Sequence, residues 1–391
     1  MKILMVAPVP FFVERGTPIR ILEEALALEK EGVDIDIVTY HLGRNIGEIR
    51  EKTKIRIYRI ARLLFWYNKK EAGADWQKVI LDILLIWKIS KIVFLKKPKI
   101  IHAHLHEGVL AGWVVKKIFF WRDIKLVADF HGGLVSEMES HGYLNGGLLK
   151  NIFRFLEKSI FSLGDWTITS SSELKERVIN LRKKNNNVSV VLDGVNLDKY
   201  KIKRRGEISD NNIKVIYSGS FVKNKGIDLL LKSIKEISQM NIKNISFILA
   251  GSPVVNIQDF IRKNNLEGIV QIISPLEYNK LPEINQRGDI GIDPKTSEVG
   301  QASGKILQYM AAGLPVICFD RKNNHKYLGE AGYYIKENST EKVVSSILDL
   351  MRNPDKINTM SRISKKRSAD FSWEKSAKKI IKIYNKVNNP S

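Results

Sequence analysis

The sequence predicts a protein of the α/β class with two Rossmann-like domains, and three observations support this prediction. The chain has 391 residues, a length typical of two domains and long enough for three. Short apolar runs alternate with amphipathic stretches, as in parallel sheets that helices cover on both faces. This alternation stops in a polar and basic segment, residues 197–211, and then starts again. We therefore expect a first domain at residues 1–196, a linker at 197–211 and a second domain at 212–371.

The first domain is expected to open with a strand, a helix and a second strand. The apolar run Lys2–Pro8 predicts the first strand, and Asp34–Thr39 predicts the second. Between them, apolar residues recur at helical spacing over Pro18–Glu31. Thr17 is the expected N-cap of this helix, and Gly32 is its expected stop. Further strands are expected at Lys99–Ala103, Lys125–Asp129, Trp166–Thr169 and Val188–Val191.

The stretch Trp76–Lys97 is the most apolar in the chain, and it has two interpretations. Four charged residues interrupt it, so it lacks the ~20 clean apolar residues of a membrane span. It can be a long core helix of the first domain. Alternatively it can lie in a membrane interface, because Phe65, Trp66 and Tyr67 precede it and lysines end it. Both interpretations remain open from the sequence.

The second domain repeats the same rhythm of strands and helices. Helices are expected over Gly226–Ile237 and Ser303–Ala312, and a basic amphipathic helix over Ser372–Val387 ends the chain. The expected strands are Lys214–Tyr217, Ile245–Ala250, Val270–Ile273, Ile290–Asp293 and Pro315–Phe319.

Composition excludes several classes of protein. Apolar residues make up 44% and charged residues 27% of the chain, as in soluble globular proteins. The single cysteine, Cys318, excludes a disulfide framework and a cysteine-based zinc site. The N-terminus runs directly into a strand pattern without the apolar core of a signal peptide. We therefore expect a cytoplasmic protein.

The net charge is +22, and it is concentrated in parts of the chain. Residues 51–100 carry 13 lysines and arginines against 4 acidic residues, a net charge of +9. Such a surface suits an anionic partner, such as phosphate groups or acidic lipid, or else it is a solvated lysine-rich surface. No nucleic-acid partner is expected, because no known nucleic-acid-binding motif is present.

In open parallel sheets, ligands bind beyond the carboxyl ends of the strands. In the first domain, Gly16 opens a helix after the first strand and lets an anion approach the helix N-terminus. His102, His104 and His106 follow the third predicted strand, and His131 follows the next. No acidic or cysteine cluster is evident that would turn these histidines into a metal site, so we expect them to line a sugar or phosphate site.

The second domain offers two anion-binding helix starts. Gly219, Ser220 and Lys225 lie in a glycine-bearing turn that leads into a helix. The second start is formed by Ser303, Gly304 and Lys305, and Gln308 lies one turn further along the helix. Two such starts in one domain favour a diphosphate ligand such as a nucleotide sugar.

The sequence resembles the retaining glycosyltransferases of family 4, the glycosyltransferase group 1 type, which have the GT-B fold. The resemblance covers almost the whole chain and rests on the segments IIHAH, DWTITSSSELKE, VLDGVNLDKY, YSGSFVKNKGID, ISFILAGSP and SGKILQYMAAGLPVICFD. It implies two domains that face each other across a cleft. The C-terminal domain would hold a nucleotide-sugar donor, the N-terminal domain would hold the acceptor, and residues 372–391 would pack back onto the N-terminal domain.

The resemblance also assigns roles to individual residues. Lys225 matches the phosphate-binding lysine of the family, His131 matches the histidine that approaches the donor sugar, and Gly16 matches the phosphate-facing loop. Ser220 stands where the family has an arginine. The two family glutamates, eight positions apart, fall on Gly300 and Gln308, and Glu298 is the expected substitute for the first.

The predicted function is therefore transfer of a hexose from a nucleoside diphosphate sugar to a hydroxyl acceptor, with retention of configuration. His131, Lys225 and Glu298 are the predicted catalytic residues. The acceptor is expected to be a lipid-linked glycan or a precursor of a cell-surface polysaccharide, reached from an anionic membrane surface. No metal cofactor is expected. The alternatives are a catalytically degenerate GT-B protein that binds sugar nucleotides, and a GT-B sugar-nucleotide epimerase.

Overall fold

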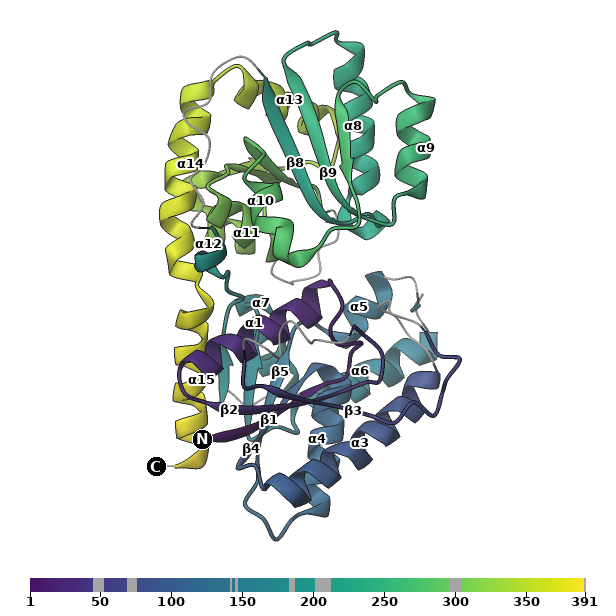
Figure 1. Ribbon diagram of the computed structural model, residues 1–391, viewed down its shortest axis with the longest axis vertical. Helices are drawn as coiled ribbons and strands as arrows, with labels where there is room; N and C mark the ends of the chain where they lie inside the picture. Colours follow the sequence, from purple (N-terminus) through teal and green to yellow (C-terminus); the bar gives the residue numbers. More distant parts are fainter. Residues whose placement is uncertain are drawn as a thin grey trace. The chain divides into compact units, whose positions relative to one another are not determined.

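The computed structural model describes residues 1–44, 53–68, 76–140, 143–144, 147–182, 187–200, 212–295 and 304–389. It divides into two compact units, each built on its own parallel sheet (Figure 1). Unit 1 contains Met1–Asp193 and Trp373–Ser391, and unit 2 contains Gly194–Glu298 and Ala302–Ser372. The predicted α/β class with two Rossmann-like units is thereby confirmed.

Unit 1 is built on a sheet whose described strands have the order β3-β2-β1-β4-β5-β6-β7, all parallel. The interior strand β1 is buried over almost its whole length, because helices cover both faces of the sheet. The strands are β1 (Lys2–Ala7), β2 (Asp34–Thr39), β3 (Arg56–Arg59), β4 (Ile100–His104), β5 (Lys125–Phe130), β6 (Trp166–Thr169) and β7 (Val188–Val190).

The helices of unit 1 cover the two faces in separate groups. Helix α1 leads from β1 toward one edge of the sheet, whereas α3, α4 and α6 lead toward the other edge. Because such crossovers are right-handed, these two groups lie on opposite faces. Helix α15 packs beside α1, and α4 contacts both α3 and α6. The helices are α1 (Gly16–Lys30), α3 (Gln77–Lys96), α4 (Leu105–Ile118), α5 (Leu134–Ser140), α6 (Gly147–Phe161), α7 (Ser172–Arg182) and α15 (Trp373–Asn388).

Two elements of unit 1 differ from the prediction. Strand β3 is not among the predicted strands, because its sequence RIYR is only half-buried and carries two arginines. Helix α1 begins at Gly16, and its N-cap is Arg15 rather than Thr17. Proline fits anywhere in the first turn of a helix, where backbone N–H groups have no helical partner, so Pro18 does not fix the first residue.

Helix α3 contributes one face to the core of unit 1. Leu81, Leu85 and Ile89 are fully buried in the main apolar cluster of that unit. The core-helix interpretation therefore holds for this face of α3. Among the described residues, no helix combines the length and the apolarity that crossing a bilayer requires.

Unit 2 is built on a second parallel sheet, whose described strands have the order β10-β9-β8-β11-β12-β13. Strand β13 is not among the predicted strands, because its residues are mostly half-buried at the sheet edge. Within the predicted linker, Leu197–Tyr200 form a short 3₁₀ turn, and residues 201–211 lie outside the described part. The strands are β8 (Ile213–Ser220), β9 (Ile245–Ser252), β10 (Val270–Ile273), β11 (Ile290–Asp293), β12 (Val316–Phe319) and β13 (Gly332–Ile335).

Helices α8 to α13 each follow a strand of unit 2, and α14 follows α13. Apolar residues of α8, such as Leu230 and Ile234, are fully buried against the sheet. The helices are α8 (Ile227–Gln239), α9 (Val255–Lys263), α10 (Leu281–Asn285), α11 (Gly304–Ala312), α12 (Lys322–Leu328), α13 (Thr340–Met351) and α14 (Pro354–Ser368).

Candidate functional site

The predicted anion-binding residues of unit 2 lie at the carboxyl edge of its sheet. Gly219 and Ser220 are the last two residues of β8. Gly219 has a φ of +143°, and a Cβ built on it would lie 3.4 Å from the Nζ of Lys305. Glycine therefore gives β8 a conformation that other residues rarely adopt, and it leaves room for Lys305 beside the backbone.

Gly226 brings Lys225 to the end of the neighbouring strand β11. Gly226 has a φ of +78°, and a Cβ there would lie 1.7 Å from the carbonyl oxygen of Pro294, which directly follows β11. Such a close backbone approach requires glycine. Lys225 precedes it as the last residue of the 3₁₀ turn Lys223–Lys225, and its charge acts on the side chain of Lys295.

Lys305 lies in the first turn of α11 and is held from two sides. Its Nζ is 3.4 Å from the Oδ1 of Asp293 and 3.9 Å from the centre of the Tyr217 ring. Burial alone would lower the pKa of Lys305, but Tyr217 and Asp293 outweigh burial and raise that pKa above its usual value. Lys305 is therefore a fixed positive charge at neutral pH.

Lys295 is a site residue that the sequence reasoning missed. Its side chain is only 9% exposed, and burial, assisted by the charge of Lys225, lowers its pKa to about 8. The signal that could have found it is its position two residues after β11, at the carboxyl edge where ligands bind. Lys225, Lys295 and Lys305, which we call the lysine cluster, therefore gather positive charge at one edge of the sheet.

The remaining predicted residues of unit 2 fall into two groups. Gly304 is the exposed first residue of α11, Gln308 is half-buried one turn after Lys305, and the exposed Ser220 reaches the carbonyl oxygen of Ser252 at 3.5 Å. Glu298, Gly300 and Ser303 lie outside the described residues.

In unit 1, His131 directly follows β5, at the carboxyl edge of that sheet. Its Nε2 lies 3.3 Å from the Nδ1 of His104 and 3.6 Å from the Oδ2 of Asp129. Burial, assisted by the charge of Arg20, lowers the pKa of His131 to about 4. The imidazole is therefore neutral at physiological pH, and it can donate or accept a hydrogen bond without carrying charge.

Asp129 is the charged centre of the buried network around His131. The Nη2 of Arg20 donates to both carboxylate oxygens of Asp129 at 3.2 Å, and Arg20 also pairs with Asp193. Burial would raise the pKa of Asp129, but Arg20 and the surrounding histidines hold it well below its usual range. The result is an ionised carboxylate that orients the imidazole groups.

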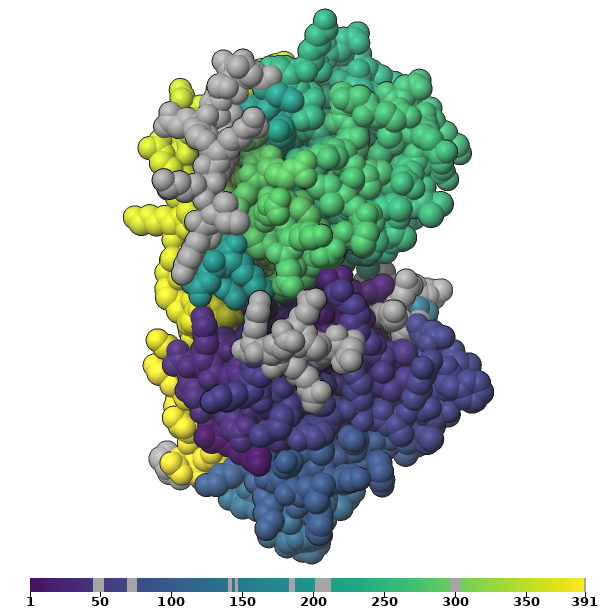
Figure 2. Space-filling model, viewed as in Figure 1, coloured from purple at the N-terminus to yellow at the C-terminus, as the bar shows by residue number. Residues whose placement is uncertain are grey.

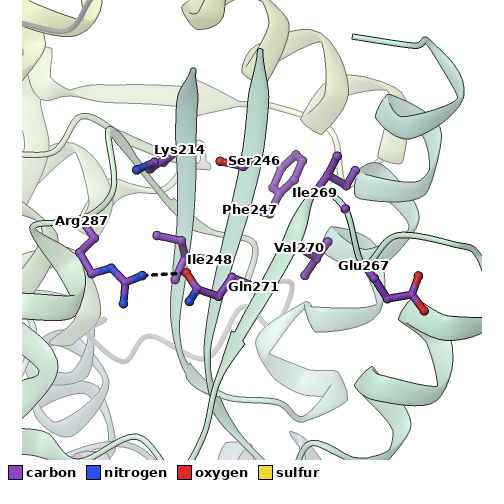
Figure 3. A pocket seen from close by; sticks show the side chains of 10 residues that line it. Lys214, Ser246, Phe247, Ile248, Glu267, Ile269, Val270, Gln271 and Arg287 are labelled. Carbon is purple, nitrogen blue, oxygen red and sulfur yellow. Dashed lines mark hydrogen bonds between the residues drawn. The ribbon is translucent and has the colours of Figure 1, made fainter. Parts of the chain in front are cut away.

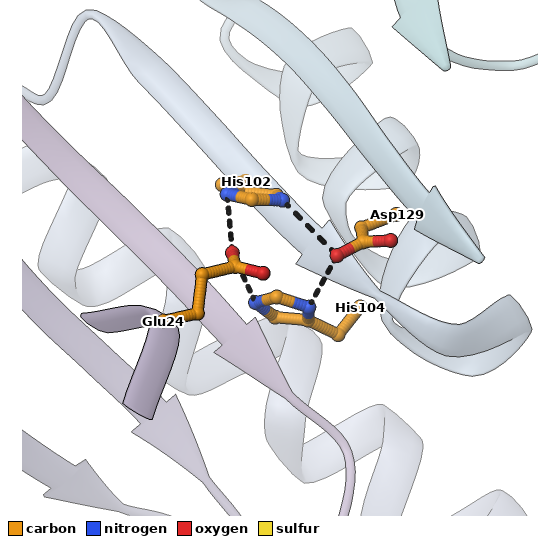
Figure 4. A group of neighbouring side chains, drawn as sticks. All are labelled: Glu24, His102, His104 and Asp129. Atoms are coloured by element: carbon orange, nitrogen blue, oxygen red, sulfur yellow. Dashed lines mark ion pairs between the residues drawn. The ribbon is translucent and has the colours of Figure 1, made fainter. Parts of the chain in front are cut away.

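Glu24 and Tyr384 extend the network away from His131. The Oε1 of Glu24 lies 3.5 Å from the Nδ1 of His102 and 4.0 Å from the Nε2 of His104 (Figure 4). Burial raises the pKa of Glu24 to about 7. The hydroxyl of Tyr384, on α15, is 2.7 Å from the Nδ1 of His102. Helix α15 therefore contributes a side chain to the polar interior of unit 1.

Acidic side chains lie beside these histidines in the structure. We expected no acidic cluster beside them, and this was wrong, because one atom each of Glu24, His102, His104 and Asp129 lie within 4.8 Å of one another. Imidazole and carboxylate groups are suitable zinc ligands. However, the guanidinium of Arg20 is 3.2 Å from Asp129 and would repel a second cation there. The arrangement therefore suits hydrogen bonding better than metal binding.

Gly16 is the exposed first residue of α1. A Cβ built on it would meet no atom within 4 Å among the described residues. Packing among the described residues therefore does not require glycine at this position.

A shallow pocket of about 170 Å³ lies in unit 2, away from the lysine cluster (Figure 3). Lys214 and Ser246, which line it, are the second residues of β8 and β9 and so mark the amino edge of the sheet. On its wall, the Nη2 of Arg287 donates to the Oε1 of Gln271 at 2.8 Å. This pocket is at the opposite edge from the predicted donor residues and is not part of the candidate site.

Two parallel sheets with functional groups at their carboxyl edges are typical of the GT-B glycosyltransferase class. The fold is similar to that of Anabaena HepE in complex with UDP-glucose, with a TM-score of 0.75 and 14% identity over 98% of this chain and 99% of that chain. Residues 15–199 match the model of Glycosyltransferase Family 4, and residues 198–367 match that of the Glycosyl transferases group 1. The chain belongs to the group 1 glycosyltransferases, and the predicted resemblance is confirmed.

Two curated relatives agree with this assignment. An uncharacterized glycosyltransferase of Methanocaldococcus jannaschii is 26% identical over 182 residues, which are 44% of this chain and about half (48%) of that relative. The D-inositol 3-phosphate glycosyltransferase of Corynebacterium glutamicum is 20% identical over 397 residues, which cover 95% of this chain and 91% of that protein.

Proposed function

We propose that this glycosyltransferase moves a hexose from a nucleoside diphosphate sugar to a hydroxyl group, with retention of configuration at the anomeric carbon. The observation that carries the proposal is the lysine cluster at the carboxyl edge of unit 2. Lys305 is largely buried but already pairs with Asp293 at 3.4 Å. Lys295 is also largely buried, and burying a cationic side chain is costly unless an anion binds it. The UDP-glucose bound to the similarly folded HepE supports a diphosphate donor.

The chemistry requires the cluster to stabilise a leaving group. The bond between the anomeric carbon and the diphosphate oxygen breaks, and the diphosphate leaves with the bonding electrons. The acceptor oxygen forms the new bond on the same face of the sugar, and its proton passes to the leaving phosphate. Fixed ammonium groups favour this transfer because negative charge grows on the phosphate oxygens as the bond breaks.

His131 is proposed to hydrogen-bond the donor sugar. Because its pKa lies near 4, the ring offers a neutral partner to a sugar hydroxyl and leaves the charge stabilisation to the lysines. Gly16, Gly219, Gly304 and Gln308 are proposed to contact the donor through backbone N–H groups or, for Gln308, through its amide. Glu298 is proposed to approach the donor sugar in place of the family glutamate.

The acceptor is proposed to be the hydroxyl of a lipid-linked glycan. The apolar outer face of unit 1, described below, supports this choice. The test is to incubate the enzyme with radiolabelled UDP-glucose and either total lipid extract or the water-soluble fraction of the source cells. Label should enter the organic phase, and NMR of the product should show the anomeric configuration of the donor. Transfer only to soluble acceptors would contradict the lipid-linked acceptor.

The donor site is tested by a matched pair of substitutions. Charge-assisted hydrogen bonds contribute roughly 1.5–3 kcal/mol, so Lys225→Ala should weaken UDP binding about tenfold or more. Lys223→Ala removes an exposed charge from the same 3₁₀ turn and should change UDP affinity by less than about threefold. Equal affinities of both variants and the unaltered protein, measured by calorimetry, would refute the lysine cluster as the donor site.

A non-catalytic sugar-nucleotide binder is the second candidate. Ser220 and Gly300 favour it, because they replace an arginine and a glutamate that the family resemblance predicts at these positions. Such a protein would bind UDP-glucose without releasing UDP from it in the presence of any cell fraction, whereas the proposed transferase releases UDP together with the labelled product.

A further inference from the structure

Helix α3 carries two apolar stripes on opposite faces. One stripe, which includes Leu85, is buried in the core, as described above. The other stripe consists of Val79, Ile83, Trp87 and Phe94, each about 60% exposed. An enzyme helix that packs on a sheet normally presents a polar outer face. The second stripe therefore does not pack against the core of unit 1. Residues 53–68 and 76–96 lie at the surface of that unit (indigo and blue in Figure 2).

Helix α6 also has an exposed apolar stripe, and its buried face includes a charged residue. Its outward residues Leu148, Ile152 and Phe155 recur at helical spacing, and two of them are 70% or more exposed. Its inward face instead carries Glu157, which is buried and accepts a 2.7 Å hydrogen bond from Arg177. Leu148, Ile152 and Phe155 therefore point outward, whereas the carboxylate of Glu157 is buried on the face that also carries the core residues Ile160 and Phe161.

The two exposed stripes belong to one surface. Helix α4 contacts both α3 and α6, so the three helices cover the same face of the sheet. The turn that follows α4 adds Phe120 and Trp121, both largely exposed. We call the outer face of α3, α4 and α6, together with this turn, the outer apolar face. An exposed apolar area of this extent marks an interaction surface.

The charges on these helices are mostly positive. Within α3, α4 and α6 there are nine lysines and arginines against three acidic residues. Each acidic residue is engaged: Asp82 with Tyr40 at 2.5 Å, Glu107 with Lys78 at 3.9 Å, and Glu157 as above. Basic side chains also flank the aromatic rings, with the Lys91 ammonium 5.7 Å from the Trp87 ring centre and the Arg122 guanidinium 5.7 Å from the Phe94 ring centre.

We propose that the outer apolar face docks unit 1 on the anionic surface of a lipid bilayer. Tryptophan and phenylalanine side chains would enter the headgroup region, and the surrounding lysines and arginines would contact the lipid phosphates. A second copy of the chain is a poorer occupant. A two-fold contact would set the same positive face against itself, and the cores of protein interfaces are depleted of lysine.

This docking extends the proposed function. It rests on that function only for the identity of the acceptor that the membrane would supply. Helices α3, α4 and α6 lead from the carboxyl edge of the sheet back to its amino edge, so their first turns lie at the edge that holds His131. The outer apolar face runs along the whole length of these helices, from Val79 and Leu148 in their first turns to Trp121 beyond the end of α4, so docking would bring the carboxyl edge of unit 1 as well as its amino edge to the headgroups, where the hydroxyl of a lipid-linked acceptor lies.

The test is co-sedimentation of the full chain with vesicles of phosphatidylcholine containing 30% phosphatidylglycerol. Most of the protein should sediment with these vesicles at low salt, and the sedimented fraction should fall as salt rises, because the lipid charges become screened. The double variant Ile83→Glu, Phe155→Glu should bind at least tenfold more weakly. Both positions are exposed, so the fold should tolerate the change.

A matched control uses exposed apolar residues of unit 2. Met240→Glu, Val255→Glu introduces the same charge and should sediment like the unaltered protein. UDP affinity, measured on the same samples, should be equal in all three proteins, so a failure of docking is distinguished from a failure of the donor site. Protein that stays in the supernatant at low salt overturns the proposal. So does a dimer in sedimentation velocity that the Ile83→Glu, Phe155→Glu variant abolishes.

Discussion

Replacing Lys295 with methionine should stabilise the protein and weaken donor binding at the same time. The folded-state pKa of Lys295 is about 8, against 10.5 for an unburied lysine, because the side chain is buried beside Lys225. A difference of 2.5 pKa units means that the charged ammonium group destabilises the folded state by roughly 3 kcal/mol at pH 7. Methionine has a similar length and no charge, so it removes this cost.

The sign of the pH dependence follows from proton binding. Between pH 8 and pH 10.5 the unfolded chain holds the Lys295 proton and the folded protein does not, so this residue makes stability rise with pH in that window. Below pH 8 its full cost is present. Lys295→Met should therefore raise the free energy of unfolding by up to about 3 kcal/mol at pH 7, and the gain should shrink toward pH 10.

The donor site predicts the opposite effect on binding. Loss of one charge-assisted contact should weaken UDP affinity by about tenfold or more. Chemical denaturation at pH 7 and pH 10, with calorimetry of UDP binding, measures both effects, and Lys223→Met is the control with an exposed lysine. A variant that is less stable at pH 7 and still binds UDP normally would refute the reasoning. The lower stability would mean that the buried ammonium group does not destabilise the folded state, and the normal binding would mean that it does not contact the diphosphate.

Three further predictions concern other parts of the site. Gly226→Ala should destabilise unit 2 by about 2–4 kcal/mol, because its Cβ would overlap the carbonyl oxygen of Pro294 at a positive φ; thermal unfolding checks this, and a melting temperature equal to that of the unaltered protein would contradict it. Glu24→Gln should stabilise unit 1 at pH 8 more than at pH 5, because the folded-state pKa of about 7 makes the wild-type stability fall as pH rises from 4.5 through 7; an equal change in melting temperature at both pH values would argue against a buried, protonated Glu24. Sugar transfer should persist within about twofold in excess EDTA, since lysines supply the charge at the diphosphate; dependence on added magnesium or manganese would contradict this.

The positions of most strands along the chain could be predicted, because buried parallel strands appear in the sequence as continuous apolar runs. Strands β3 and β13 could not, since edge strands are buried on fewer sides and tolerate arginine and tyrosine. The start of α1 was misplaced because its N-cap, Arg15, makes no side-chain capping hydrogen bond.

The candidate site was anticipated in part. The glycine-bearing turns mark the ends of strands in the sequence, and they led to Gly219, Lys225 and Lys305. Lys295 lies in no glycine-bearing turn, and its position after β11 alone does not show that Lys225 lies beside it; that requires the approach of Gly226 to Pro294 in the folded protein. In the same way, the partners of the histidines come from α1 and β5, and only the folded chain shows that Glu24 and Asp129 meet them. The exposed stripe of α6 also required the structure, since a helical apolar pattern does not say which face is buried.

The position of α15 has a consequence for how the protein folds during synthesis. Unit 1 begins with Met1 but needs Trp373–Asn388, whose Tyr384 reaches His102 in the interior of that unit. The ribosome makes all of unit 2 between these two parts of unit 1. Unit 2 can therefore complete its core first. Until α15 has been synthesised, unit 1 lacks the helix that packs beside α1. An N-terminal fragment ending near Asp193 should remain loosely packed and prone to aggregation until that helix is supplied, even as a separate peptide.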